Sequence, residues 1–184
     1  MRRYWFPKAY ADMVARLRVP CGFILVAAFA WFSDPSPRSL AWGIPISLLG
    51  LLLRAFAAGY LAKNENLATG GPYRFIRNPL YVGTLLVAAG LVIASRSLLL
   101  AVLFTAVFLL IYLPVIELEE QHLRKLFPKY AEYAARVPML VPQGRMADRS
   151  GEFRTSLYLR NQEYQALLGY IAGLALLVWK AGLI

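Results

Sequence analysis

Five apolar stretches, each close to the length that crosses a bilayer, constrain this 184-residue chain more than any other feature. They run over Val14–Ser33, Leu40–Ala62, Leu80–Ser95, Leu98–Ile116 and Tyr164–Ile184. A helix needs about 20 mostly apolar residues to cross the hydrocarbon core, and helices satisfy their own backbone hydrogen bonds in lipid. The pattern predicts an all-α fold: a polytopic membrane helical bundle of about five transmembrane helices, forming a single domain over residues 1–184.

The composition argues against several other kinds of protein. Hydrophobic residues make up 59% of the chain, which is too apolar for an ordinary soluble domain. Cys21 is the single cysteine, so neither a disulfide framework nor a cysteine metal site is expected. His122 is the single histidine, and one histidine near carboxylates is weak evidence for a metal site, so none is expected.

The basic residues predict how the chain lies in the membrane. The formal net charge is +10, but lysines and arginines beside apolar spans set topology or meet anionic lipid, so nucleic acid is not the expected partner. Residues 1–18, 63–79 and 117–163 carry 16 of the 20 lysines and arginines, and Arg38, Arg96 and Lys180 lie on the opposite side. The N-terminus and both long polar segments are therefore predicted to be cytoplasmic, the C-terminus to lie on the opposite side, and residues 1–18 to rest in the membrane interface.

The first polar segment, 63–79, ends in an unusual run of polar residues just before the third span. Thr69-Gly70-Gly71-Pro72 permits a turn in which backbone N–H groups face a ligand, although an ordinary connecting turn is the simpler interpretation. Asn78-Pro79 suits the start of a helix, with Asn78 as its cap. Helix initiation explains neither Arg77 nor Tyr81.

The second polar segment, 117–163, begins with three acids at the end of the fourth span. Pro114 is expected to kink that helix, and Glu117, Glu119 and Glu120 follow within four residues. Helical spacing places Glu117 and Glu120 on one face and turns Glu119 away. A solvated acidic turn, with Glu120 paired to Arg124, is the alternative interpretation.

Two sequence blocks carry a resemblance to a known family. LATGGPY at 67–73 and RNPLYVG at 77–83 resemble the pattern L-V-T-x-G-x-Y-x-x-x-R-H-P-x-Y-x-G of the isoprenylcysteine carboxyl methyltransferase family, which is related to the phospholipid methyltransferases. EEQHL at 119–123, Phe127, YAEY at 130–133 and RVP at 136–138 resemble its second block, E-E-x-x-L…F-G-x-x-Y-x-x-Y…R-V-P. The resemblance covers about residues 65–142, and two blocks in the correct order are more specific than either alone.

The resemblance implies a cytoplasm-facing pocket that binds S-adenosyl-L-methionine, and a lipophilic acceptor that arrives from the membrane lipid. A site at the membrane boundary suits both, because the methyl donor is soluble in water whereas an acyl or prenyl chain prefers hydrocarbon. Carried over to this sequence, the cofactor-binding residues are Leu67, Thr69, Gly70, Gly71, Tyr73, Asn78, Tyr81 and Glu119.

The same resemblance makes Arg77 and Glu120 the expected catalytic residues. A guanidinium fork at Arg77 suits an acceptor carboxylate, with simple snorkelling to the interface as the alternative. Glu120 would orient Arg77 or assist substrate binding, and would take the proton if the acceptor were an amine. Arg54, deep in the second span, and Tyr133 are the expected substrate-binding residues, although Arg54 is as well suited to pairing with a backbone carbonyl.

Three positions depart from the family pattern. Asn78 stands where the family has histidine and cannot titrate, and Glu65 stands where the animal enzymes have another histidine. Residues 127–130 are one residue shorter than F-G-x-x-Y, which shifts the register of the tyrosines. These changes put individual cofactor contacts in doubt.

The sequence therefore predicts an integral membrane methyltransferase dependent on S-adenosylmethionine, acting most naturally on an isoprenylcysteine-like carboxylate. A phospholipid amine N-methyltransferase is the first alternative. An NADPH-dependent membrane reductase, or a noncatalytic membrane protein altered at Asn78 and Glu65, are alternatives from other classes. The physiological acceptor and the oligomeric state are left open by the sequence.

Overall fold

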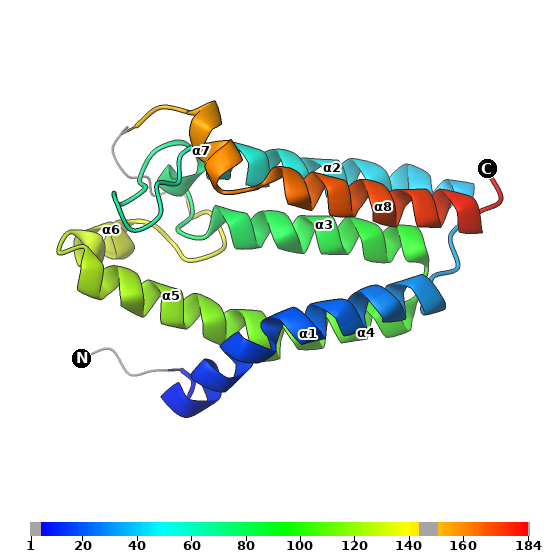
Figure 1. The fold of residues 1–184 in the computed structure, drawn as a ribbon, viewed down its shortest axis with the longest axis horizontal. Helices are drawn as coiled ribbons and strands as arrows, with labels where there is room; N and C mark the ends of the chain where they lie inside the picture. The colour runs from blue at the N-terminus through cyan, green and yellow to red at the C-terminus, as the bar shows by residue number, and fades with distance from the viewer. Residues whose placement is uncertain (1–4, 144–150, 184) are drawn as a thin grey trace.

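The computed structural model describes residues 5–143 and 151–183, which form helices, turns and loops and no strand. Five long helical rods run alternately up and down the molecule (Figure 1). They are α1 (Lys8–Phe32), α2 (Pro37–Ala58), α3 (Pro79–Ser95), α4 (Leu98–Val107) continued through the π-helical turn η2 (Phe108–Tyr112) into α5 (Leu113–Leu126), and α8 (Tyr164–Lys180). Three short helices complete the chain: η1 (Gly71–Arg74), α6 (Tyr130–Arg136) and α7 (Thr155–Arg160).

Helix length and exposed surface confirm the helical membrane bundle. By length and composition, α1, α2 and the continuous rod over Leu98–Leu126 can cross a bilayer. The apolar helices α3 and α8 have 17 residues each, at the lower end of the spanning range. Large apolar side chains such as Phe23, Trp42 and Leu168 lie exposed, as expected where a helix meets lipid.

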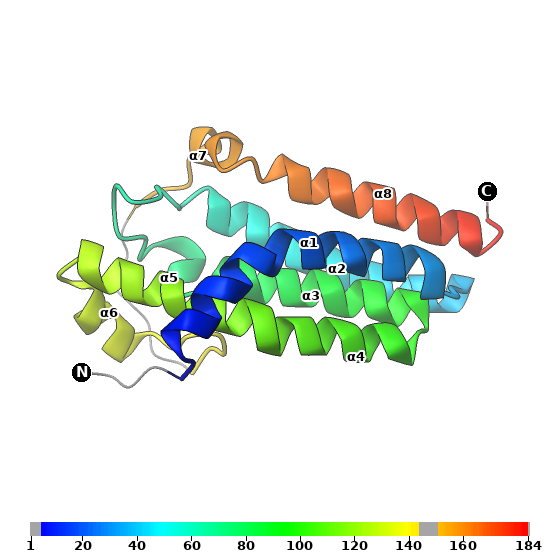
Figure 2. The same cartoon turned by 60° about the horizontal axis from the view of Figure 1, so that its bottom comes forward.

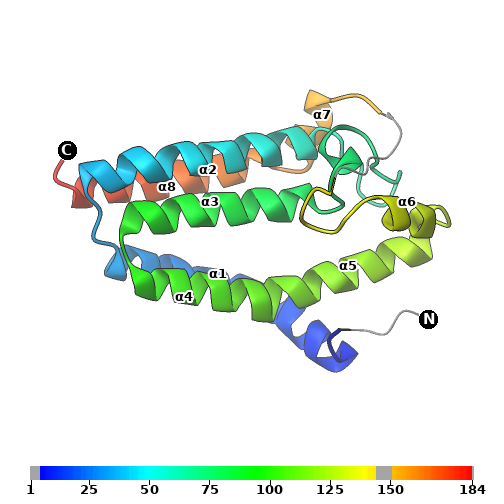
Figure 3. The same ribbon diagram turned by 180° about the vertical axis from the view of Figure 1, so that it is seen from behind.

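The structure ends the second expected span early and shows how far the helix of the fourth continues. The second stretch was expected to run to Ala62, but α2 ends at Ala58 and Gly59 begins a loop. The fourth apolar stretch ends at Ile116, and its helix continues to Leu126, as the helical spacing expected for the three acids requires, and projects beyond the start of α3 (Figure 3). The hydropathy of the sequence marks where the apolar character ends, and the helical hydrogen bonding of α5 continues past that point.

The tightest packing in the bundle is between α2 and α3. Gly43 and Gly50 on α2 face Gly90 and Gly83 on α3, and a Cβ added at Gly50 would lie 2.6 Å from the carbonyl oxygen of Gly83. Small residues allow two membrane helices to bring their backbones into contact. This pair therefore provides a rigid support for the residues that precede α3.

The rod formed by α4, η2 and α5 contains a local change of helical register. Pro114 has no N–H and cannot donate to the carbonyl of Leu110, four residues earlier. The hydroxyl of Tyr10 on α1 donates to that carbonyl at 2.6 Å instead. The expected effect of Pro114 therefore takes the form of a π-helical turn before it, with α1 supplying a hydrogen bond that the rod lacks.

Both polar segments gather at one end of the bundle, where α1 begins, and α8 ends at the opposite end (Figure 1). The 137–143 segment runs from α6 back to the start of α3 (Figure 3), where the backbone N–H of Arg77 donates to the carbonyl of Pro138 at 2.9 Å. Helix α1 changes direction along its length (Figure 2), as Pro20 in its interior explains. The clustering of the segments is confirmed, and the cytoplasmic location of this end remains a prediction.

Candidate functional site

A cavity of about 520 Å³ opens at this end of the bundle, which is the size of a small-molecule site. Side chains of α1, α2, α3, α5 and α6 and of the loop after α2 form its wall. The lining residues are Arg18, Arg54, Leu61, Ala62, Lys63, Asn64, Asn66, Leu67, Ala68, Tyr73, Arg77, Leu80, Tyr81, Thr84, Tyr112, Glu119, His122, Leu123, Phe127, Tyr130 and Tyr133.

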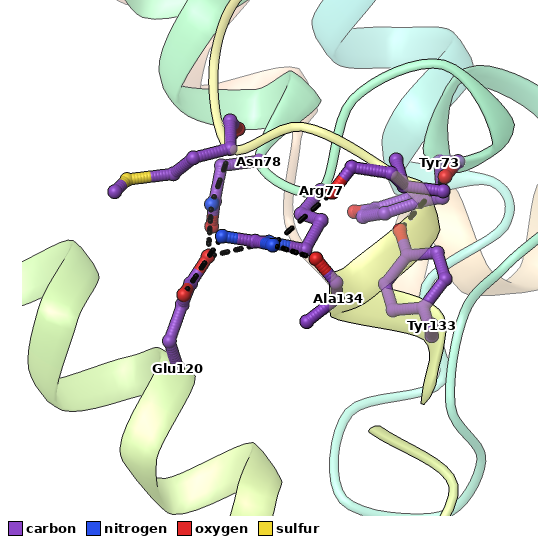
Figure 4. Close-up of polar contacts among 8 residues, drawn as sticks. Tyr73, Arg77, Asn78, Glu120, Tyr133 and Ala134 are labelled. Atoms are coloured by element: carbon purple, nitrogen blue, oxygen red, sulfur yellow. Dashed lines mark hydrogen bonds and ion pairs between the residues drawn. The ribbon is translucent and has the colours of Figure 1, made fainter. Parts of the chain in front are cut away.

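Arg77, which lines this cavity, forms a buried ion pair with Glu120, which does not (Figure 4). Arg77 is 9% exposed and Glu120 is 7% exposed. The guanidinium donates Nε to Oε1 at 2.8 Å and Nη2 to Oε2 at 3.1 Å. Its Nη1 donates to the carbonyls of Ala134 at 2.7 Å and Val137 at 3.1 Å. Arg77 thus joins α3, α5 and α6, and most of its hydrogen-bonding capacity is used within the protein.

Asn78 precedes α3 but does not cap it with its side chain, which corrects the expected cap. Its Nδ2 donates to Glu120 Oε1 at 3.2 Å and to the carbonyl of Met139 at 3.4 Å (Figure 4). The amide therefore supports the same carboxylate as Arg77. Pro79 occupies the first turn, where its missing N–H costs little.

Three buried tyrosines attach α6 to the segment before α3. The Tyr133 hydroxyl donates to the carbonyl of Tyr73 at 2.7 Å, and the Tyr130 and Tyr133 rings pack edge to face. Burial raises the pKa of Tyr73, Tyr130 and Tyr133, and the charge of Glu120 adds to the raised pKa of Tyr130. The three hydroxyls therefore stay protonated at neutral pH and act here through hydrogen bonds.

The three acids of α5 have three different partners. Glu117 accepts the backbone N–H groups of Trp5 at 2.8 Å and Phe6 at 3.1 Å, and so holds the chain leading into α1. Glu119 is exposed, lines the cavity and accepts the Tyr81 hydroxyl at 2.9 Å. Glu120 faces Arg77, so the alternative pairing with Arg124 is wrong; the Arg124 guanidinium lies over the Tyr130 ring.

Arg54 forms the second ion pair at the cavity. Its Nε donates to Glu163 Oε1 at 2.6 Å and its Nη2 to Glu163 Oε2 at 3.0 Å. Its Nη1 donates to the Thr84 hydroxyl and to the carbonyl of Leu80 at 3.4 Å. Glu163 lies at the start of α8, so this pair ties α2, α3 and α8 together.

The structure brings many of the residues expected from the sequence to one cavity. Those in its wall are Leu67, Tyr73, Tyr81, Glu119, Arg77, Arg54 and Tyr133. Thr69, Gly70, Gly71, Asn78 and Glu120 are not among the lining residues. Gly71 has a φ of +52° and a Cβ there would lie 2.6 Å from the Tyr60 ring, so backbone geometry accounts for this glycine.

The sequence did not single out several residues of the wall. Arg18 was counted only among the basic residues that set membrane topology, and Tyr112 and Thr84 lie within apolar spans that gave no sign of a site. Glu163 was assigned only to a polar segment, although it pairs with Arg54 across 109 residues. An arginine deep in a span needs a partner, and that requirement was the signal for an acid such as Glu163.

A second, apolar cavity of about 340 Å³ lies deeper between α1, α3 and α4. It is lined by Leu25, Thr84, Leu85, Ala88, Ala89, Val92, Ile93, Ala101, Phe104, Thr105, Val107, Phe108 and Tyr112. Thr84 and Tyr112 also line the polar cavity, so the two cavities are neighbours that share these side chains. A polar space and an apolar space thus adjoin at the level of η2.

Comparison with known proteins identifies the family of this chain. The model of the phospholipid methyltransferase family matches residues 46–130. The nickel-cobalt-cadmium resistance protein NccN of Alcaligenes xylosoxydans xylosoxydans is 31% identical over 174 residues, covering 90% of this chain and 76% of the relative. The chain belongs to the phospholipid methyltransferase family.

A second relative shares a shorter region. The cobalt-zinc-cadmium resistance protein CzcN of Cupriavidus metallidurans is 38% identical over 110 residues, covering 59% of this chain. The match spans about half, 51%, of that relative's own length. No solved structure shows a significant match. The family membership supports a membrane methyltransferase and confirms the family resemblance read from the two motif blocks.

Proposed function

We propose that this member of the family transfers a methyl group from S-adenosylmethionine to the carboxylate of a lipophilic acceptor. The observation that carries the proposal is the adjacency of the two cavities, which share Thr84 and Tyr112. A donor from water suits the polar cavity, and an acyl or prenyl tail suits the apolar one, where each buried CH₂ contributes about 0.8 kcal/mol.

The polar wall has the chemistry that a sulfonium donor requires. The Glu119 carboxylate faces the cavity next to the Tyr81 hydroxyl, and Tyr73 and Tyr130 supply aromatic surface. A carboxylate and aromatic faces both attract a cation. Asn64, Asn66 and His122 add hydrogen-bonding groups at the loop, where His122 Nε2 lies 3.2 Å from Asn64 Oδ1. Once bound, S-adenosylmethionine supplies an electrophilic methyl group at its sulfonium centre.

The state of Glu120 favours a carboxylate acceptor over an amine. An amine must lose a proton, and Glu120 is engaged on both oxygens by Arg77 and on one by Asn78, which leaves it poorly placed as a base. A carboxylate is already ionised near neutral pH. One of its oxygens forms the new O–C bond, the electron pair of the broken C–S bond stays on sulfur, and no proton moves. The protein's task is then to align the acceptor and exclude water.

Methyl transfer from radiolabelled S-adenosylmethionine into a membrane lipid and protein extract tests the proposal. We expect label in a lipophilic product and its release by alkali, because esters hydrolyse where N-methyl groups do not. Alkali-stable label would support the phospholipid amine alternative. Glu119→Gln should weaken binding of S-adenosylmethionine, whose sulfonium carries the charge that Glu119 attracts, while Glu132→Gln, at an exposed position of α6, is the matched control. Binding of NADPH and no binding of S-adenosylhomocysteine would overturn the proposal.

The names of both relatives refer to resistance to metal ions, and we propose that this chain contributes to such resistance through its methyl transfer. The 31% identity to NccN over 90% of the chain supports this extension. A host strain expressing the wild-type chain should tolerate cadmium or cobalt better than one expressing Glu119→Gln. If both strains express the protein equally and tolerate the metal ion equally, methyl transfer by this chain does not contribute to metal resistance.

A further inference from the structure

Arg18 is the arginine of the polar cavity whose charge has no partner among the residues that the structure describes. Of the described residues, four cationic side chains line this cavity: Arg18, Lys63, Arg54 and Arg77. Arg77 is bound to Glu120, and Arg54 to Glu163. Arg18 is exposed, and within residues 5–143 and 151–183 it takes part in no hydrogen bond or ion pair. Its guanidinium is therefore available to a ligand.

Helix α1 carries Arg18 to the place where the two cavities adjoin. Arg18 lines the polar cavity together with Tyr81, whose hydroxyl donates to Glu119. Leu25 follows seven residues later, which is two helical turns, and so falls on nearly the same face of α1. Leu25 lines the apolar cavity. One face of α1 thus presents the cation of Arg18 to the polar cavity and the side chain of Leu25 to the apolar cavity.

We infer that Arg18 binds the anionic group of the acceptor, with the acceptor's tail lying along α1 toward Leu25. This inference rests on the proposed function and names the substrate class further: a lipid-borne anion, either a carboxylate or a phosphodiester. A guanidinium binds both through two parallel N–H donors. The Glu119 carboxylate in the same cavity repels an anion, so the acceptor's charge is directed toward Arg18.

The position of Arg18 in the chain supports a role in binding the acceptor. The family model matches residues 46–130, so α1 lies outside the matched region. The residues that bind the shared donor are expected within that region, and a helix outside it can differ between relatives with different acceptors. Lys63 is less suitable, because it lies on the loop after α2, and neither α2 nor that loop lines the apolar cavity.

Binding measurements on the purified full chain in detergent micelles test the inference without relying on turnover. The probes are N-acetyl-S-farnesylcysteine and its uncharged carboxamide, with phosphatidylglycerol in the micelles as the phosphodiester. The variant is Arg18→Gln, and the matched control is Arg16→Gln, which removes the same charge from the same exposed part of α1 but does not line the cavity. S-adenosylhomocysteine binding is measured on each protein.

We expect wild type to bind an anionic probe about tenfold more tightly than the carboxamide, because a hydrogen bond to a charged group contributes about that much. Arg18→Gln should abolish this preference, Arg18→Lys should restore part of it, and Arg16→Gln should retain it. Displacement of the farnesylcysteine by phosphatidylglycerol would identify the phosphodiester as the anion. S-adenosylhomocysteine binding should stay unchanged throughout.

The inference is overturned if Arg18→Gln and Arg16→Gln prefer the anionic probe over the carboxamide to the same extent, even if both proteins transfer methyl groups. The same holds if wild type does not distinguish the carboxylate and the phosphodiester from the carboxamide. Failure of the proposed function gives a different result: no S-adenosylhomocysteine binding and no methyl transfer, whatever happens at Arg18. Where methyl transfer is observed, Arg18→Gln should raise the KM for the anionic acceptor about tenfold and leave that for the donor unchanged.

Discussion

The two sides of the polar cavity differ in how completely their charged groups are paired. On the side formed by α3, α5 and α6, Arg77 donates to Glu120 and to two backbone carbonyls, and Asn78 supports the same carboxylate. On the α1 side, Arg18 has no partner among the described residues. Helix α1 is held by contacts such as Tyr10 to Leu110 near its start and Phe29 in the apolar core near its end. One side is fixed before any ligand arrives, and the other has a charge left for a ligand.

This difference suggests a division of work between the sides. The fixed side lies within the region that the family model matches, and α1 lies outside it. A site that binds the same donor in every relative benefits from groups held in place in advance. A site that selects an acceptor benefits from a helix whose sequence can change without disturbing the groups that bind the donor. Four single substitutions and one double variant test this comparison, starting with the largest expected effect.

Arg77→Ala should have the largest effect, because it leaves Glu120 buried without its cation. Removing one partner of a buried pair costs about 3–5 kcal/mol, so unfolding of the detergent-solubilised protein should shift strongly to lower temperature. Binding of S-adenosylhomocysteine should fall as well, because α3, α5 and α6 are no longer joined. If Arg77 acted only as a catalytic residue, as the resemblance implies, donor binding would persist in this variant and only turnover would be lost.

The double variant Arg77→Met with Glu120→Leu separates the structural role of the pair from a direct role. Apolar replacement of a buried ion pair is often neutral for stability, so the double variant should recover much of the lost thermal stability. If Arg77 acts only as a clamp, donor binding returns with stability. Restored folding and donor binding without methyl transfer would instead support the catalytic role expected for Arg77 from the resemblance.

Glu163→Gln should have a smaller effect on stability, about 2 kcal/mol. It removes the charge that binds Arg54, but Arg54 is 22% exposed and retains the Thr84 hydroxyl and the Leu80 carbonyl. Thermal unfolding measures the loss, and Gln165→Ala, an exposed neighbour on α8, is the control. A loss as large as that of Arg77→Ala would mean that the Arg54 pair belongs to the fixed side as well.

Sequence reasoning succeeded where a pattern is local. Apolar stretches of about 20 residues located all five rods, because bilayer thickness sets the length of a span. The two motif blocks led to the correct family and placed Tyr81 and Glu119 in one cavity wall. In both cases residues near each other in sequence carry the signal.

The same reasoning failed where a partner lies far along the chain. Asn78 looked like a helix cap because its neighbour is Pro79, yet its side chain reaches Glu120, 42 residues away. Glu120 looked able to pair with Arg124 on its own helix, but Arg77 reaches it from another segment. Arg18 looked like a topology charge because its position over the cavity depends on how α1 packs. Long-range packing decides these contacts, and a single sequence does not record it.

Tyr133→Phe should cost about 1–2 kcal/mol, because it leaves the buried carbonyl of Tyr73 without its donor. The ring and its packing against Tyr130 are retained, so the effect isolates one hydrogen bond of the fixed side. Donor binding and thermal unfolding should weaken together. Tyr158→Phe on α7, outside the cavity lining, is the control. Unchanged stability would show that the Arg77–Glu120 pair suffices to hold this side.

Tyr10→Phe should have the smallest effect on stability, below about 1 kcal/mol, because Tyr10 and the Leu110 carbonyl lie at an exposed contact. Its value is that it loosens the attachment of α1 without touching either cavity wall. If α1 selects the acceptor, the preference for an anionic over an uncharged farnesylcysteine should fall, while S-adenosylhomocysteine binding stays at the wild-type level. Equal losses of donor and acceptor binding would show that α1 supports the whole cavity, and the division between the two sides would then be wrong.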